Sequence, residues 1–203
     1  MKPVGVLALQ GGYDAHARCL SSINVPWRLV RTSAELEQCG GLILPGGEST
    51  THLKLIERFN LETSLNAFVG AGHPVLATCA GLILAATQVS GPGQPSFGWL
   101  DNDVERNGWG RQVHSFEAPL EDPLAPASLQ SHPPFALMFI RAPKITRCGQ
   151  GVEVVARFRN EAVAVRQGSF YGMSFHPELK NDARFHALVF KNETEVQVPA
   201  STV

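Results

Sequence analysis

The sequence lacks any hydrophobic stretch long enough to cross a membrane. Its longest apolar run covers residues 75–86 and is interrupted by Thr78 and Gly81, whereas a membrane-spanning helix needs about 20 apolar residues. The apolar run near the N-terminus, residues 4–9, is shorter than the hydrophobic core of a signal peptide and shows no evident cleavage pattern. We therefore expect a cytoplasmic protein.

A strong charge of either sign is also missing. The chain contains 17 Lys and Arg against 18 Asp and Glu, which gives a net charge of −1. Such a balance offers no bulk electrostatic attraction for nucleic acid or for an anionic membrane. With 203 residues, of which 44% are hydrophobic, the chain is long enough to bury a full core, and its length predicts a single domain.

Paired cysteines and phosphate-binding glycine motifs are absent. The four cysteines, Cys19, Cys39, Cys79 and Cys148, form no CxxC pair, which excludes zinc-ribbon and thioredoxin-type sites. The sequence has neither GxxxxGK(S/T) nor GxGxxG, so nucleotide binding finds little support. We expect no metal and no cofactor, and we expect every cysteine except Cys79 to be a small buried hydrophobic residue.

The first half of the chain alternates short apolar runs with helical patterns. The runs predict strands at residues 4–9, 27–30, 41–44 and 74–77. Helices are expected at residues 14–21, 61–71 and 80–87, with a further one starting near Ser49 or Thr50, either of which can cap it. Apolar strands alternating with helices predict an α/β fold with a parallel sheet covered on both faces.

The second half has a different pattern. After a Gly/Pro-rich loop at residues 90–96, strands are expected at 104–106, 113–117, 136–140, 152–158, 162–166 and 169–175. Because no long helices separate them, we expect antiparallel strands that extend the core sheet. A last helix is predicted over residues 182–191, and residues 192–203 form a polar tail that we expect to fray. The predicted domain is therefore 1–191.

The segment Ala-Thr-Cys-Ala-Gly at residues 77–81 carries the clearest chemical signal. It leads from a predicted buried strand directly into a predicted helix, with Cys79 at the junction between small residues. This pattern is typical of a nucleophile elbow with cysteine in place of serine. The N-terminus of the following helix favours a thiolate at such a position. A structural cysteine in a strand–helix turn is the alternative.

A histidine–carboxylate pair follows the last predicted strand. In His176-Pro177-Glu178 the proline favours an extended His176. Residues i and i+2 of an extended chain point the same way, so the two side chains can lie side by side. Both this pair and Cys79 follow strands at the carboxyl edge of the predicted sheet, where Glu178 would orient His176 toward the cysteine.

A glycine turn at residues 45–47 ends another strand, ahead of Glu48 and Ser49. Backbone N–H groups in such a turn can stabilise an oxyanion. Phosphate binding and a simple turn are the alternatives.

Eight ordered segments between residues 4 and 190 resemble one protein family. They read LQG at 9–11, LILPGGESTT at 42–51, TCAGL at 78–82, VERN at 104–107, GRQV at 110–113, SFE at 115–117, FIRAP at 139–143 and SFHPE at 174–178. Together they resemble the class I glutamine amidotransferases with a Cys-His-Glu triad, and within them the glutaminase subunits of pyridoxal phosphate synthase. The resemblance implies an α/β three-layer sandwich with a mixed, mainly parallel central sheet.

The same resemblance implies roles for individual residues. Cys79 would be the nucleophile, His176 the acid–base and Glu178 the residue that orients it. Gly47 and Ala80 would offer backbone N–H groups to the oxyanion. The implied glutamine-binding positions are Gly47, Glu48, Ser49, Arg106, Ile140 and Arg141, and Gln10 is a candidate contact with the partner.

The implied reaction is hydrolysis of L-glutamine to L-glutamate and ammonia through a cysteinyl thioester. The ammonia would pass to a partner synthase subunit that makes pyridoxal phosphate from a pentose phosphate and a triose phosphate. A glutaminase fold would use nearly all of the 203 residues, so we expect the synthase to be a separate chain in a hetero-oligomeric complex. Two alternatives remain: a cysteine peptidase or chaperone-like protein on a related sheet, and a regulatory subunit without catalysis.

Overall fold

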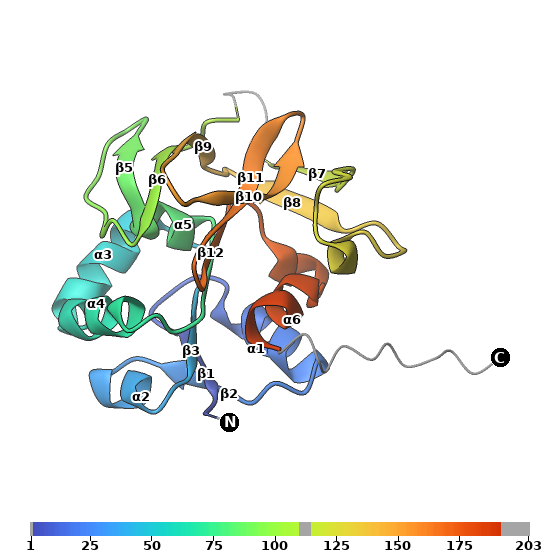
Figure 1. Ribbon diagram of the computed structural model, residues 1–203. Helices are drawn as coiled ribbons and strands as arrows, with labels where there is room; N and C mark the ends of the chain where they lie inside the picture. Colours follow the sequence, from blue (N-terminus) through green and yellow to red (C-terminus); the bar gives the residue numbers. More distant parts are fainter. Residues whose placement is uncertain (1, 110–114, 192–203) are drawn as a thin grey trace.

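A seven-stranded sheet forms the centre of the protein in a computed structural model, which describes residues 2–109 and 115–191 (Figure 1). Its strand order is β10-β11-β12-β4-β3-β1-β2. The strands are β1 (Val4–Leu7), β2 (Trp27–Val30), β3 (Gly41–Leu44), β4 (Val75–Thr78), β10 (Glu153–Phe158), β11 (Glu161–Gln167) and β12 (Phe170–Met173). Strands β1 to β4 and β12 run parallel, whereas β10 and β11 pair antiparallel. The predicted mixed, mainly parallel sheet is therefore confirmed.

Helices cover both faces of this sheet, as Figure 1 shows. On one face lie α1 (Tyr13–Ser22) and α6 (Arg184–Phe190). On the other lie α2 (Ser33–Glu37), α3 (Ser49–Arg58), α4 (Glu62–Gly70) and α5 (Ala80–Ala85). Successive residues of a strand point to opposite faces, so Leu42 and Leu44 join one core while Ile43 joins the other. The result is the three-layer arrangement expected of an α/β fold.

The other strands lie outside the central sheet. A three-stranded sheet combines β5 (Ala86–Ser90), β6 (Leu100–Glu105) and β9 (Lys144–Cys148), and β7 (Ser115–Pro119) pairs with β8 (Ala136–Ile140). The expectation that the second half adds antiparallel strands to the core sheet is confirmed for β10 and β11, whereas β6, β7, β8 and β9 lie outside that sheet. The reason is burial: β7 and β6 are covered on one face only, whereas β3 and β4 are buried on both.

Several other expectations need correction. Strand β5 begins where the helix predicted at 80–87 was expected to continue, and β9 was not predicted. Cys19 and Cys39 are buried as expected, but Cys148 is exposed because it ends the outer strand β9. The predicted tail at 192–203, the GRQV segment and the first two residues of the strand predicted at 113–117 lie outside the described residues.

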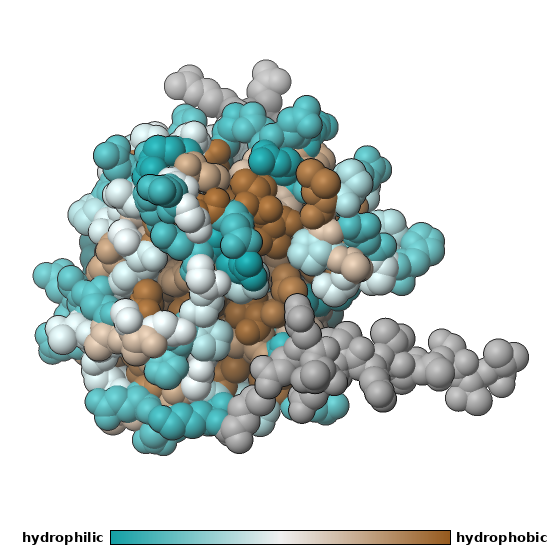
Figure 2. Space-filling model, in the orientation of Figure 1, coloured by the Kyte–Doolittle hydropathy of each residue, from teal (hydrophilic) through white to brown (hydrophobic). Residues whose placement is uncertain are grey.

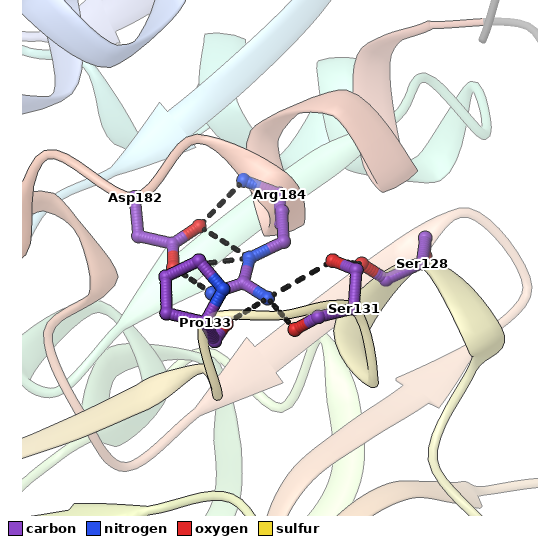
Figure 3. Close-up of polar contacts among 5 residues, drawn as sticks. All are labelled: Ser128, Ser131, Pro133, Asp182 and Arg184. Atoms are coloured by element: carbon purple, nitrogen blue, oxygen red, sulfur yellow. Dashed lines mark hydrogen bonds and ion pairs between the residues drawn. The ribbon is translucent and has the colours of Figure 1, made fainter. Parts of the chain in front are cut away.

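Arg184 fixes the long connection between β7 and β8, which contains the 3₁₀ helix η1 (Ala127–Leu129) (Figure 3). Its guanidinium donates hydrogen bonds to the Asp182 carboxylate, to the carbonyl and hydroxyl oxygens of Ser131, and to the Pro133 carbonyl. It also lies over the Phe135 ring, with Cζ 5.0 Å from the centroid. These contacts hold the connection against the start of α6.

The surface seen in Figure 2 is largely hydrophilic, with hydrophobic side chains emerging around β10 and β11. Val152, Val154 and Val155 are half-buried there. Within residues 2–109 and 115–191, every helix is too short to span a bilayer.

Candidate active site

Cys79 occupies the turn between β4 and α5. Its backbone has φ 47° and ψ −99°, a conformation that costs a non-glycine residue about 1–3 kcal/mol. The surrounding structure holds this turn, because the Cys79 N–H donates to the Met173 carbonyl at 2.8 Å and the Cys79 carbonyl accepts from the Ile83 N–H at 3.1 Å. The thiol is thereby presented at the carboxyl edge of the sheet, 5% exposed.

His176 and Glu178 lie beside this turn. The His176 Nδ1 is 2.7 Å from the Glu178 Oε1, and both residues are buried. The predicted juxtaposition is found, but not the extended conformation behind it. Pro177 starts a 3₁₀ helix, η2 (Pro177–Lys180), and the tight turn brings the carboxylate back to the imidazole.

The glycine turn after β3 packs against these residues. A methyl group on Gly46 would lie 2.2 Å from Cε1 of His176, and one on Gly47 would lie 2.2 Å from Nε2 of Gln10. Glycine is therefore required at both positions, because a side chain would displace the imidazole or Gln10. The Gly46 carbonyl also accepts a hydrogen bond from the Gly12 N–H at 3.1 Å.

Gln10 lies beneath this glycine turn. Its Nε2 donates to the Glu48 carbonyl at 3.3 Å and lies 3.0 Å from Nδ1 of His52. Burial lowers the pKa of His52 to about 4, so this imidazole is neutral near pH 7. The side chain predicted to contact a partner therefore packs directly against the predicted oxyanion turn.

A small pocket of about 170 Å³ opens above Cys79. It is smaller than the ~300–1,000 Å³ sites that hold drug-sized ligands, which fits a single amino acid. Its lining comprises Gly47, Glu48, Ser49, Cys79, Ile83, Arg106, Asn107, Ile140, Arg141 and His176. The structure thus brings all six predicted substrate-binding residues together with the cysteine and histidine, while Ala80 follows Cys79 as the first residue of α5.

Charged groups of both signs face this pocket. Arg106 Nη2 pairs with Glu48 Oε1 at 3.2 Å. The same carboxylate caps α3 through the Thr50 N–H, so neither Ser49 nor Thr50 is the cap that the sequence predicted. Arg141 has a positive φ of 43°, another strained backbone position at the pocket.

The buried histidine and glutamate hold opposite charges. Burial alone would lower the pKa of His176, but hydrogen bonds with Cys79 and Glu178 outweigh it and raise the pKa to about 10. Burial alone would raise the pKa of Glu178, but the neighbouring His16 and the hydrogen-bonded His176 outweigh burial and lower it to about 2. A cationic imidazole beside Cys79 is placed to donate a proton during the reaction.

Sequence reasoning missed several residues of the site. His16, Thr78 and His186 lie behind Glu178, and Gln94 accepts a 2.7 Å hydrogen bond from the Ser49 hydroxyl. Apart from Thr78, which stands next to Cys79 in the elbow segment, none belongs to a local motif, so only the folded chain reveals them. Across the described part of the chain, no three His, Cys, Asp or Glu side chains gather in a way that could hold a metal ion.

Comparisons with known proteins agree with this geometry. The profile of the SNO glutamine amidotransferase family matches residues 6–195. The chain is 47% identical to a pyridoxal 5′-phosphate synthase subunit PdxT from Pelotomaculum thermopropionicum, covering 90% of this chain and 91% of the relative. It is 43% identical to PdxT of Geobacillus stearothermophilus, covering 98% of each. A crystal structure described as a glutamine amidotransferase superimposes with a TM-score of 0.82 at 43% identity, covering 92% of this chain and 96% of that one.

Proposed function

Because this chain belongs to the SNO glutamine amidotransferase family, we propose that it hydrolyses L-glutamine to L-glutamate and ammonia through a thioester on Cys79. It is the glutaminase subunit of a pyridoxal 5′-phosphate synthase. The observation that carries the chemistry is that His176, held by Glu178 at 2.7 Å, lines one small pocket together with Cys79 on its strained turn. One glutaminase domain over residues 1–191 is the proposed domain organisation.

The first half of the reaction releases ammonia. The Cys79 thiolate attacks the side-chain amide carbon of glutamine, and the carbonyl π electrons move to oxygen. The proposed donors to this oxyanion are the backbone N–H groups of Gly47 and Ala80. The Ala80 N–H suits this role because the first residues of a helix lack intrahelical acceptors. His176 then gives its proton to the nitrogen, the C–N bond breaks, and ammonia and the thioester are formed.

The second half regenerates the enzyme. Neutral His176 removes a proton from water, and the resulting hydroxide attacks the thioester carbon. Collapse of this second tetrahedral intermediate breaks the C–S bond and releases glutamate. Glu178 keeps the His176 Nδ1 protonated throughout, so that Nε2 is free to exchange protons with sulfur, ammonia and water.

The pocket lining supplies contacts for the zwitterionic end of the substrate. Arg106 and Arg141 can hold the α-carboxylate, because an arginine fork matches a carboxylate bidentately. The Glu48 carboxylate can accept from the α-ammonium group. Ser49 and the Ile140 backbone complete the proposed glutamine contacts around Cys79, whose Sγ lies 3.9 Å from the Ile140 carbonyl oxygen.

The released ammonia is proposed to pass to a synthase subunit in a hetero-oligomeric complex. Gln10 is the proposed link, since its amide packs on Gly47 and a partner contact there would act directly on the oxyanion turn. This explains why we expect low glutaminase activity in the isolated chain.

A glutaminase assay with and without the co-purified synthase subunit tests the proposal. We expect a large rise in glutamate release on adding the synthase, and no release from Cys79→Ala in either state. Retained hydrolysis by pure Cys79→Ala would refute the assigned nucleophile. Full activity of the isolated chain would refute a partner-ordered oxyanion turn.

A further inference from the structure

A chain of buried polar side chains continues from Glu178 away from the pocket. The Nε2 atom of His16 lies 3.1 Å from the Thr78 hydroxyl and 3.6 Å from Oε2 of Glu178. On its other side, Nδ1 of His16 lies 2.9 Å from Nε2 of His186. His16, Thr78 and His186 are all fully buried. None of them lines the pocket.

Only one placement of the ring protons on His16 and His186 gives each of their N–H groups a partner. Nδ1 of His186 is buried and has no hydrogen-bond partner among the described residues. An orphaned buried N–H is costly, whereas a bare ring nitrogen is more easily tolerated. His186 therefore carries its proton on Nε2 and donates to Nδ1 of His16. The proton of His16 then lies on Nε2, facing Thr78 and Glu178.

The Nε2 proton of His16 faces the second carboxylate oxygen of Glu178, which has no other donor among the described residues. Oε1 accepts from His176, but Oε2 is buried and finds no partner within hydrogen-bond distance in the described part of the chain. A buried carboxylate stays ionised only where nearby donors or charges compensate its lost hydration. The Nε2–H of His16, at 3.6 Å, is the donor that faces Oε2.

We propose that His16 is a positioning residue for the glutaminase reaction, which holds Glu178 ionised and oriented toward His176. This inference rests on the proposed function. His16 acts through Glu178 and does not touch the substrate. Thr78 and His186 fix the imidazole ring of His16 from its two ends, one from the strand that leads into Cys79 and the other from α6.

Other titratable groups also face Glu178 and must be kept constant in a test. His176 contacts Glu178 from the segment after β12, and the charge of Glu178 helps to raise the pKa of the Cys19 thiol on α1. Asp182 and Arg18 act on the same thiol from further away. Because these groups stay unchanged when only His16 is substituted, a change in the His176 titration reports the His16–Glu178 contact.

Two variants of similar polarity separate positioning from packing. In His16→Gln the side-chain amide reaches about as far as Nε2 and can still donate toward Glu178. In His16→Asn the amide reaches only about as far as Nδ1, on the His186 side. The measurements are kcat and KM for glutamine in the complex with the synthase subunit, together with an NMR titration of the His176 imidazole assigned with His176→Asn.

We expect His16→Asn to lower kcat roughly tenfold or more, the usual effect of losing an outer-shell partner, and to lower the measured pKa of His176. The KM for glutamine should stay within about twofold of the native value, because His16 does not contact the substrate. His16→Gln should retain most of the native kcat and His176 titration. Equal behaviour of the two variants, in kcat and in the titration, would overturn the inference. A native complex that fails to hydrolyse glutamine would instead refute the proposed function.

Discussion

Two buried histidines, His52 and His186, make the stability of the fold depend on pH. Burial lowers the pKa of His52 to about 4 and that of His186 to about 3. In the unfolded chain a histidine titrates near 6.5. Below pH 6.5 the unfolded state therefore binds protons that the folded state does not, and the free energy of unfolding falls as the pH is lowered.

The size of the effect follows from proton linkage. Between pH 6.5 and pH 5.0, each histidine that stays neutral only in the folded state lowers the free energy of unfolding by about 1.5–2 kcal/mol. His52 and His186 together account for about 3 kcal/mol, a large part of a typical domain stability of ~5–15 kcal/mol. The pKa of His16 is also lowered by burial, so His16 adds in the same direction. The lowered pKa of Glu178 matters only below about pH 4.5, outside this window.

Urea unfolding of the full chain at the two pH values measures this difference. His52→Leu should reduce this difference by about 1.5 kcal/mol, because the linked proton of His52 is lost. His132→Gln, at an exposed position, should leave the difference unchanged. The raised pKa of His176 has the opposite effect and increases the free energy of unfolding as the pH falls. All three proteins contain His176, so this contribution cancels when they are compared. A native difference below about 1 kcal/mol, or one that His52→Leu leaves intact, would show that the buried histidines do not stay neutral in the folded state.

Two further predictions concern the pocket. Gly46→Ala should lower kcat roughly a hundredfold, since its methyl group would lie 2.2 Å from Cε1 of His176 and displace the imidazole; Gly70→Ala, where a methyl group meets nothing within 4 Å, is the control. Equal kcat values for the two variants would contradict this packing. Arg141→Gln should raise the KM for glutamine roughly tenfold with a smaller effect on kcat, because a charged hydrogen bond to the substrate contributes about 1.5–3 kcal/mol. Arg159→Gln, at another arginine with positive φ but away from the pocket, should change neither constant.

The parts of the fold that the sequence predicted well share a local signal. Strands β2 and β3 were predicted at their observed bounds, because β3 is a short apolar run stopped by Pro45 and Gly46 and β2 follows Pro26. The Cys79 turn and the glycine turn were found for the same reason, since each falls where a buried strand meets a helix.

The parts that sequence reasoning missed depend on contacts between distant residues. Residues 80–87 contain no polar side chain before Thr87, so composition could not show that α5 ends at Ala85 and that β5 starts at the next residue. Likewise, His16 and His186 are 170 positions apart and touch only because α1 and α6 pack on the same face of the sheet. No periodicity within either helix signals such a pair.

Cys79 is the proposed nucleophile of the glutaminase reaction. The most direct test incubates the complex with a glutamine analogue that carries an electrophilic carbon at the amide position and then maps the adduct by peptide mass spectrometry. The exposed Cys148 serves as the internal control for ordinary thiol reactivity. We predict one adduct, on Cys79, that is suppressed by excess glutamine and abolished in His176→Asn. An adduct on Cys148 with Cys79 unmodified, or labelling of Cys79 that glutamine does not suppress, would show that Cys79 is not the glutamine-attacking nucleophile.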